Sequence, residues 1–155
     1  MQSLPPSDVG LDKRLQLIVA SYRRLTGKHL IDAVPPDTVS LREAIWNAPR
    51  AIVAHGTEDD PIFFYGNRLA LQLFEMDFEE FARLPSRLSA EPLAQETRVK
   101  LLAKVTQQGY VHDYSGMRIA RSGRRFMIAD ATVWNLVDDS GNYAGQAAVF
   151  VAQTY

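Results

Sequence analysis

The chain has 155 residues, 46% of them apolar and 23% charged, with a formal net charge of −1. This length and composition predict one folded domain with its own core, and the balanced charge argues against a nucleic-acid binder, which would need a basic surface. Cysteine is absent, which excludes disulfides, thiolate catalysis and cysteine-ligated metal centres. The start has no secretory-signal pattern, and no apolar run approaches the roughly 18 residues of a membrane span. We therefore expect a soluble, cytoplasmic protein.

The first third of the chain predicts helices and then a pair of strands. Apolar side chains recur every three or four residues over residues 9–26, which is typical of an amphipathic helix. Two prolines in residues 33–37 predict a linker, and a brief helix is expected from Thr38 or Ser40 to near Asn47. Residues 50–55 and 62–65 are expected to form strands.

Three helices and three strands are expected in the remainder. Asn67 is a candidate N-cap for a helix through residue 74, and Asp77 with Glu80 resembles a capping box for a second one. A third helix is expected from Pro92 to residue 108. The expected strands are 110–121, 124–137 and 143–154. This order predicts an α+β fold with an antiparallel sheet, divided into an N-terminal helix and linker (1–37) and a domain (38–155).

Several strings in order carry a closer match. They are LPSRLSAEP after LFEMDFEEFARL, then YSGMRIARSGRRF, VWNL and GNYAGQAAVF. Over roughly residues 41–150 the chain resembles the MEKHLA domain, a PAS-like module found in standalone bacterial proteins and at the C-terminus of some plant homeodomain–leucine zipper regulators. The resemblance implies a PAS-like five-stranded antiparallel sheet with helices on one face, and a role in bacterial signal sensing or protein association. These residues include no homeodomain or zipper, so DNA binding does not carry over.

The resemblance also permits a test for cofactors, and we expect none. Blue-light PAS domains that bind flavin need a cysteine, which is absent here, and their flavin-contacting Asn and Gln positions fall near Arg118, Ile128 and Phe150. Haem-binding PAS sensors commonly use a histidine on the helix before the central strands, and residues 93–108 contain none. The three histidines are scattered, so no metal site is predicted.

Alternation along the central hairpin selects the candidate pocket residues. If the turn centres on Ser122–Arg124, Arg118 pairs with Ile128. One face is then mixed, with His112, Tyr114, Gly116, Arg118, Phe126, Ile128, Asp130, Thr132 and Trp134, and the other is apolar. We expect the mixed face to line a pocket under the helices, with the apolar face beneath the N-terminal helix or a second subunit. The alternative is that the mixed face is solvated. Arg118, diagonal to Asp130, would form an ion pair with it or await an anionic ligand.

The loop before the last helix has two interpretations. Arg87, Ser89 and Glu91 could form a polar lid over the pocket. Alternatively, Ser89 caps the helix beginning near Pro92 while Arg87 pairs with a nearby carboxylate. Asn67 is a further candidate for the pocket rim.

The leading hypothesis is a non-enzymatic PAS-like module that binds a small molecule and forms a homodimer through its N-terminal helix and apolar sheet face. The predicted ligand-binding residues are Asn67, Arg87, Ser89, His112, Tyr114, Arg118, Asp130 and Trp134. One alternative is a small ketosteroid-isomerase-like enzyme with His112 and Asp130 as acid–base groups. Another is a protein-association domain whose interior is closed by Phe126 and Trp134.

Overall fold

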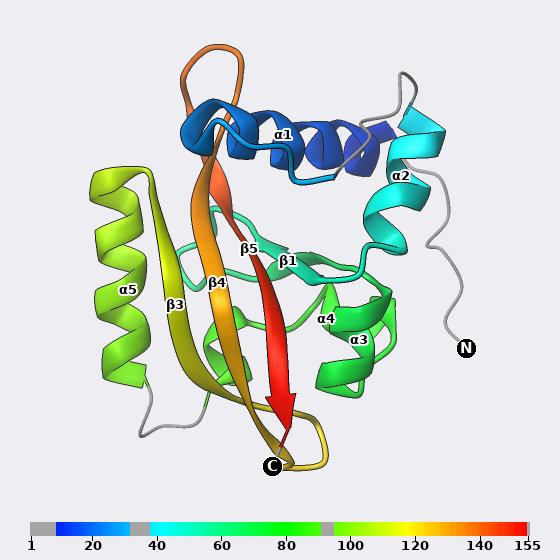
Figure 1. Ribbon diagram of the computed structural model, residues 1–155, viewed down its shortest axis with the longest axis vertical. Coiled ribbons are helices and arrows are strands. Elements are labelled where there is room, and N and C mark those ends of the chain that lie inside the picture. Colours follow the sequence, from blue (N-terminus) through cyan, green and yellow to red (C-terminus); the bar gives the residue numbers. More distant parts are fainter. Residues whose placement is uncertain (1–8, 32–37, 91–94, 155) are drawn as a thin grey trace.

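The computed structural model describes residues 9–31, 38–90 and 95–154 (Figure 1). Its elements are α1 (Val9–Thr26), α2 (Thr38–Trp46), β1 (Ala51–His55), β2 (Phe63–Gly66), α3 (Arg68–Phe74), α4 (Phe78–Phe81), the 3₁₀ helix η1 (Ser86–Ser89), α5 (Gln95–Gln108), β3 (Tyr110–Ile119), β4 (Arg125–Val137) and β5 (Tyr143–Thr154). Every expected helix and strand is present, and η1 is an addition. Glu91 and Pro92, proposed for a lid and for the start of α5, lie outside the described residues.

The five strands form one antiparallel sheet in the order β2-β1-β5-β4-β3. The hairpin β1–β2 and the three-stranded unit β3–β4–β5 form one sheet because β5 pairs with β1. The helical block between them covers one face, so the predicted α+β architecture is confirmed. No helix in the described part of the chain is long and apolar enough to cross a membrane.

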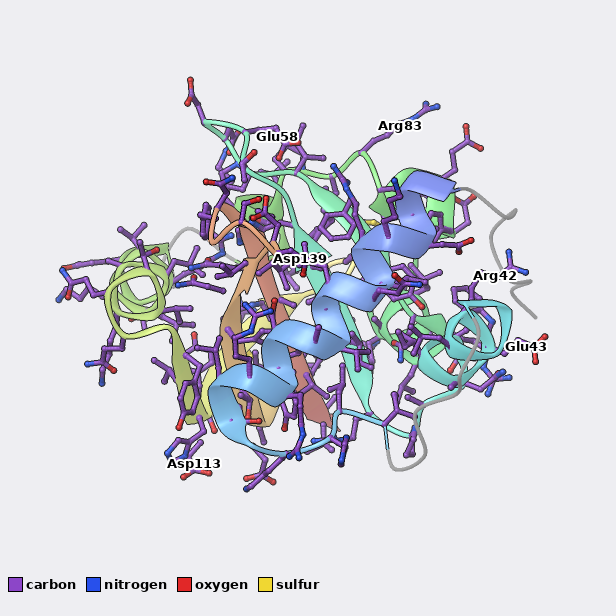
Figure 2. The ribbon with its side chains drawn as sticks, turned by 90° about the horizontal axis from the view of Figure 1, so that it is seen from above. Arg42, Glu43, Glu58, Arg83, Asp113 and Asp139 are labelled. Carbon is purple, nitrogen blue, oxygen red and sulfur yellow. The ribbon has the colours of Figure 1, made fainter. Side chains whose placement is uncertain are left out.

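Helix α1 covers the face of the sheet opposite to α5. Val133 packs with α5, whereas the indole Nε1 of Trp134 donates to the carbonyl of Ile18 in α1 at 3.2 Å. Because neighbouring side chains on a strand point to opposite faces, these two helices lie on opposite sides of the sheet. Figure 2 shows α1 crossing the sheet, with α5 off to one side. The N-terminal helix thus covers Trp134, which was expected on the mixed face, whereas Val133 of the expected apolar face packs with α5.

Helix α1 also shares its hydrophobic core with the rest of the chain. Its buried side chains Leu15, Ile18 and Tyr22 belong to the same cluster as the sheet residues, and Tyr22 meets Trp134 edge-on at 4.8 Å between ring centroids. The boundary expected at residue 37 falls outside the described residues and stays a prediction.

Two bulges change the alternation of the central strands. Asp113 and Asp130 have φ values of 57° and 51°, and the pairing register shifts beside each of them. Each bulge adds a residue to its strand, so the side chains beyond it change face. Nearer the hairpin turn, Arg118 lies opposite Phe126 rather than the expected Ile128.

Asn67 fixes the corner between β2 and α3 and is fully buried. Its Oδ1 accepts from the N–H groups of Ala70 and Ile52 at 3.1 and 3.0 Å, which confirms the predicted N-cap. Its Nδ2 donates to the carbonyls of Ile45 and Arg50 at 3.1 and 2.9 Å. All four of these hydrogen bonds connect Asn67 to backbone groups of the fold, so Asn67 has a structural role.

Candidate functional site

A cavity of about 60 Å³ lies between the sheet, α5 and η1. Most of its wall is apolar and comes from β1, β2, β4, β5 and α5, including Val53, Phe63, Leu101 and Ile128. Polar side chains interrupt this wall at His55, Ser86, Ser89, Arg98, Tyr114, Arg118 and Gln146. An apolar cavity with a few convergent polar groups is the usual form of a small-molecule site.

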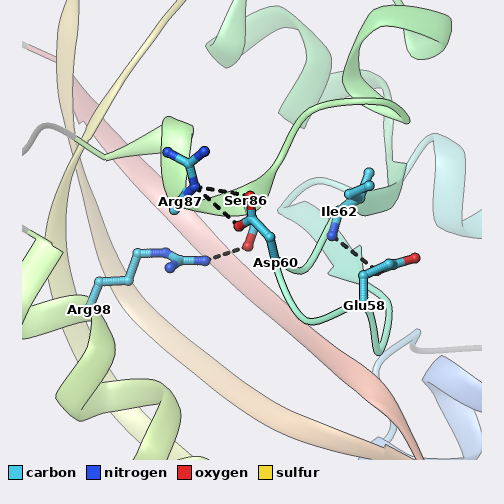
Figure 3. Close-up of polar contacts among 6 residues, drawn as sticks. All are labelled: Glu58, Asp60, Ile62, Ser86, Arg87 and Arg98. Carbon is cyan, nitrogen blue, oxygen red and sulfur yellow. Dashed lines mark hydrogen bonds and ion pairs between the residues drawn. The ribbon is translucent and has the colours of Figure 1, made fainter.

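Arg98 is the buried cation that α5 contributes to the cavity. It is 8% exposed, and its Nη2 donates to the hydroxyl of Ser86 in η1. Burial, and next the neighbouring Arg118, lower the pKa of Arg98 from 12.5 to about 10. Figure 3 shows Arg98 reaching from α5 to Ser86, while Arg87 pairs with Asp60.

Arg118, on β3, is the second buried cation and is also 8% exposed. Its Nη1 donates to the carbonyl of Met117 at 2.8 Å, and its Cζ lies 5.8 Å from the ring centre of Tyr114. Gly116 lies between them: a Cβ there would be 2.4 Å from the Tyr114 hydroxyl and 3.1 Å from Nη1 of Arg118. The glycine leaves room for both side chains to lie against the strand.

His55 ends β1 at the cavity wall. Its Nδ1 lies 3.0 Å from the carbonyl oxygen of Gly56, and its buried Nε2 has no hydrogen-bond partner among the residues that the structure describes. Burial lowers the pKa of His55 below 6.5, and the hydrogen bond to Gly56 opposes this effect only in part. The ring is therefore neutral at pH 7.

Gln146 connects the cavity wall to α5 through a buried amide network. Its Nε2 donates to Asn135 Oδ1 at 3.1 Å, and Asn135 Nδ2 donates to the carbonyl of Val105 at 3.0 Å. The network joins β5, β4 and α5 at one end of the cavity. Sequence reasoning missed both amides, although each interrupts a mainly apolar stretch of its strand.

The structure places three of the predicted site residues at the cavity. Arg118 and Tyr114 line it from β3, as expected for the mixed face. Ser89 also lines it, but its hydroxyl donates to the carbonyl of Ser86 at 2.7 Å, within η1. The helix start near Pro92 that Ser89 was expected to cap lies outside the described residues, and the described part of α5 begins at Gln95.

Three predicted residues of the central hairpin lie away from the cavity. Trp134 is on the opposite face under α1, because the bulge at Asp130 reverses the alternation and brings Val133 to the cavity instead. Asp130 itself is exposed on that bulge and is not the partner of Arg118. His112 is exposed beside its own bulge, where its Nδ1 lies 2.8 Å from the carboxylate of Asp113.

Two further candidates have structural roles outside the cavity. Asn67 is bonded within the corner described above. Arg87 is about half exposed and pairs with Asp60 at 3.1 Å, as the second interpretation of this loop expected. Phe126 packs on Phe74 with ring centres 5.1 Å apart, but Trp134 is on the other face, so these two aromatics do not close the interior together.

The fold is that of PAS domains. A PAS domain from Colwellia psychrerythraea matches with a TM-score of 0.64 and 16% identity, covering 77% of this chain and 98% of that one. The LOV domain of a blue-light-activated histidine kinase from Erythrobacter litoralis matches with a TM-score of 0.56 and 18% identity, covering 70% and 100%. The model of the MEKHLA domain matches residues 12–155. The chain belongs to the MEKHLA domain family.

The sequence relatives of this MEKHLA domain are much longer plant proteins. Homeobox-leucine zipper protein HOX10 of Oryza sativa is 24% identical over 135 residues, covering 86% of this chain and 16% of the relative. ATHB-9 of Arabidopsis thaliana is 26% identical over 127 residues, covering 79% and 15%. The chain thus spans about a sixth of these relatives, and the expected bacterial source finds no support in them.

Arg118, Ile128 and Phe150, which were expected near the flavin-contacting positions of blue-light PAS domains, all line the cavity of this MEKHLA domain. Groups of three or more metal-ligating side chains are absent from the part of the chain that the structure describes.

Proposed function

We propose that this MEKHLA domain is a non-enzymatic PAS-like sensory module that binds a small molecule in the cavity between the sheet, α5 and η1. The observation that carries the proposal is the presence of two buried guanidiniums, Arg98 and Arg118, in a mainly apolar wall. Buried charges are costly to a fold unless they are paired. Their retention at one cavity favours a ligand that the fold itself does not supply.

The position of the acid–base candidates supports a binding role over the enzyme alternative. His112 and Asp130 are both exposed and neither lines the cavity. A catalytic pair must reach one substrate from a shared site. Turnover that Asp130→Asn abolishes would reverse this part of the proposal.

Native mass spectrometry of freshly purified protein, followed by melting curves across a metabolite panel, tests the proposal. We expect a retained ligand or a concentration-dependent rise in the melting temperature. Ala148→Phe should remove this response because Ala148 lines the cavity. Ala152→Phe is the matched control, since Ala152 is on the same strand and outside the lining. A wild-type protein with neither a retained ligand nor any melting shift would contradict the proposal.

The homodimer expected through α1 and the apolar sheet face stays a prediction. The apolar stripe of α1 packs on the chain's own sheet, and Lys13, Arg23 and Arg24 are on its exposed side. A dimer that used this sheet face would require α1 to move. Size-exclusion chromatography with light scattering at high micromolar concentration is the check, and a monomer there would contradict the prediction.

A further inference from the structure

We propose that the ligand is a small aliphatic carboxylate, with its carboxylate bound by Arg98 and Arg118 and its alkyl group against the apolar wall. This inference rests on the proposed function, because it names the class of molecule that the cavity would take. It follows from the charge, the free hydrogen-bonding capacity and the size of the cavity.

The cavity carries positive charge that the described residues do not neutralise. Throughout residues 9–31, 38–90 and 95–154, no carboxylate forms an ion pair with Arg98 or Arg118. Asp60, on the neighbouring loop, forms its ion pair with Arg87 (Figure 3), and its attraction is the smallest of the effects on the pKa of Arg98. His55 is held neutral by burial and so adds no charge of either sign. An anion entering this cavity would meet two cations that form no ion pair with an acid of these segments.

Both guanidiniums keep donors for such an anion. A guanidinium has five N–H donors in a planar fork that matches a carboxylate. Within the described residues, Arg98 donates one hydrogen bond, to Ser86, and Arg118 donates one, to Met117. The two cations come from different elements, α5 and β3, and lie close enough for Arg118 to lower the pKa of Arg98. One carboxylate placed between them could accept from both.

The rest of the cavity sets the size and polarity of the ligand. A water needs about 10–15 Å³ of such space, so 60 Å³ holds about four to six waters and favours a small ligand. The apolar part of the wall includes Val53, Phe63 and Ile128, which offer no charge. Acetate, propionate and butyrate fit this description.

The test uses the full chain and calorimetric titration with propionate and butyrate, after dialysis to remove any retained ligand. Propionamide is the neutral isostere, and sodium chloride and inorganic phosphate are the arms for non-specific anion binding. We expect saturable binding of the carboxylates that is at least tenfold tighter than that of propionamide or of either inorganic anion.

Variants separate recognition from folding. Arg98→Met and Arg118→Met should each weaken carboxylate binding at least tenfold, and Arg98→Lys at least threefold, since it keeps the charge and loses the fork. Arg83→Met, at an exposed arginine paired with Glu79, should bind as the wild type does. Melting curves of each variant establish that it is folded. If a methionine variant is not folded, Arg98→Lys provides the test of carboxylate recognition.

Three outcomes would overturn the inference: no saturable carboxylate binding, equal binding of propionamide, or full binding by folded Arg98→Met and Arg118→Met. If a neutral metabolite then binds the wild type and Ala148→Phe loses it, the proposed function stands without the carboxylate. If nothing binds, both fail.

Discussion

Replacing Arg98 by methionine should stabilise the ligand-free protein. Folding lowers the pKa of this guanidinium from 12.5 to about 10, which corresponds to about 3 kcal/mol against the charged form. The folded pKa is the lower one, so the unfolded chain holds this proton more tightly. At pH 7 the group is charged in both states and the full penalty applies. Methionine removes the charge but loses the hydrogen bond to Ser86, which is worth about 2 kcal/mol because its donor is charged. The net gain expected is about 1 kcal/mol.

Urea unfolding of dialysed protein measures this gain directly. For a chain of this size, 1 kcal/mol also predicts a rise of about 2–4 °C in melting temperature. Arg83→Met, exposed and paired with Glu79, should change stability by less than about 0.5 kcal/mol. An Arg98→Met protein that is less stable than wild type by more than about 1 kcal/mol would refute the reasoning, because Arg98 would then be a structural residue. Stabilisation together with lost carboxylate binding would distinguish a binding residue from a folding one.

Three further predictions concern the surrounding fold. Asn67→Ala should lower the free energy of unfolding by about 3 kcal/mol in urea, because it removes the cap and leaves the buried Ile52 N–H unpaired. Asp77→Ala, where the side chain caps only through the N–H of Glu80, should lower it by about 1 kcal/mol. Equal losses in the two variants would contradict this prediction. The folded-state pKa of His55 lies below 6.5, so the unfolded chain gains its proton first as pH falls, and the free energy of unfolding should decrease below about pH 6.5. His55→Gln should flatten this pH profile, and parallel profiles would show the idea to be wrong. Gly145→Ala should lower the free energy of unfolding by more than about 3 kcal/mol, since φ is 126° and a Cβ would lie 2.1 Å from the carbonyl oxygen of His55. Gly141→Ala, where the space is open, should lower it by roughly 1 kcal/mol. A similar loss in the two variants would be evidence against the close approach at Gly145.

Local signals account for the parts of the fold that were predicted. Asn67 and Asp77 cap the helices that they were expected to cap, since an N-cap bond spans only a few residues. The strands 110–121, 124–137 and 143–154 were expected from their alternation and turn residues, and they agree with β3, β4 and β5 to within a few positions. The family strings extended this order of elements to the PAS-like sheet.

The errors arose where side-chain alternation was extended through a bulge. Asp130 adopts a left-handed backbone conformation, and no adjacent glycine or proline indicates this in the sequence. The side chains after it change face. Trp134 was therefore assigned to the cavity, and Val133 to the opposite side. On β3, the bulge at Asp113 interrupts the alternation beside His112 in the same way.

The sequence by itself determined the elements, their order and the family, because capping, periodicity and turn chemistry act over a few residues. Only the tertiary structure decided which side chains share the cavity. Arg98 looks like an ordinary polar residue of an amphipathic helix, and it becomes a buried cation because α5 packs beside η1 and β3. Its burial and its proximity to Arg118 are products of long-range packing, which no local pattern encodes.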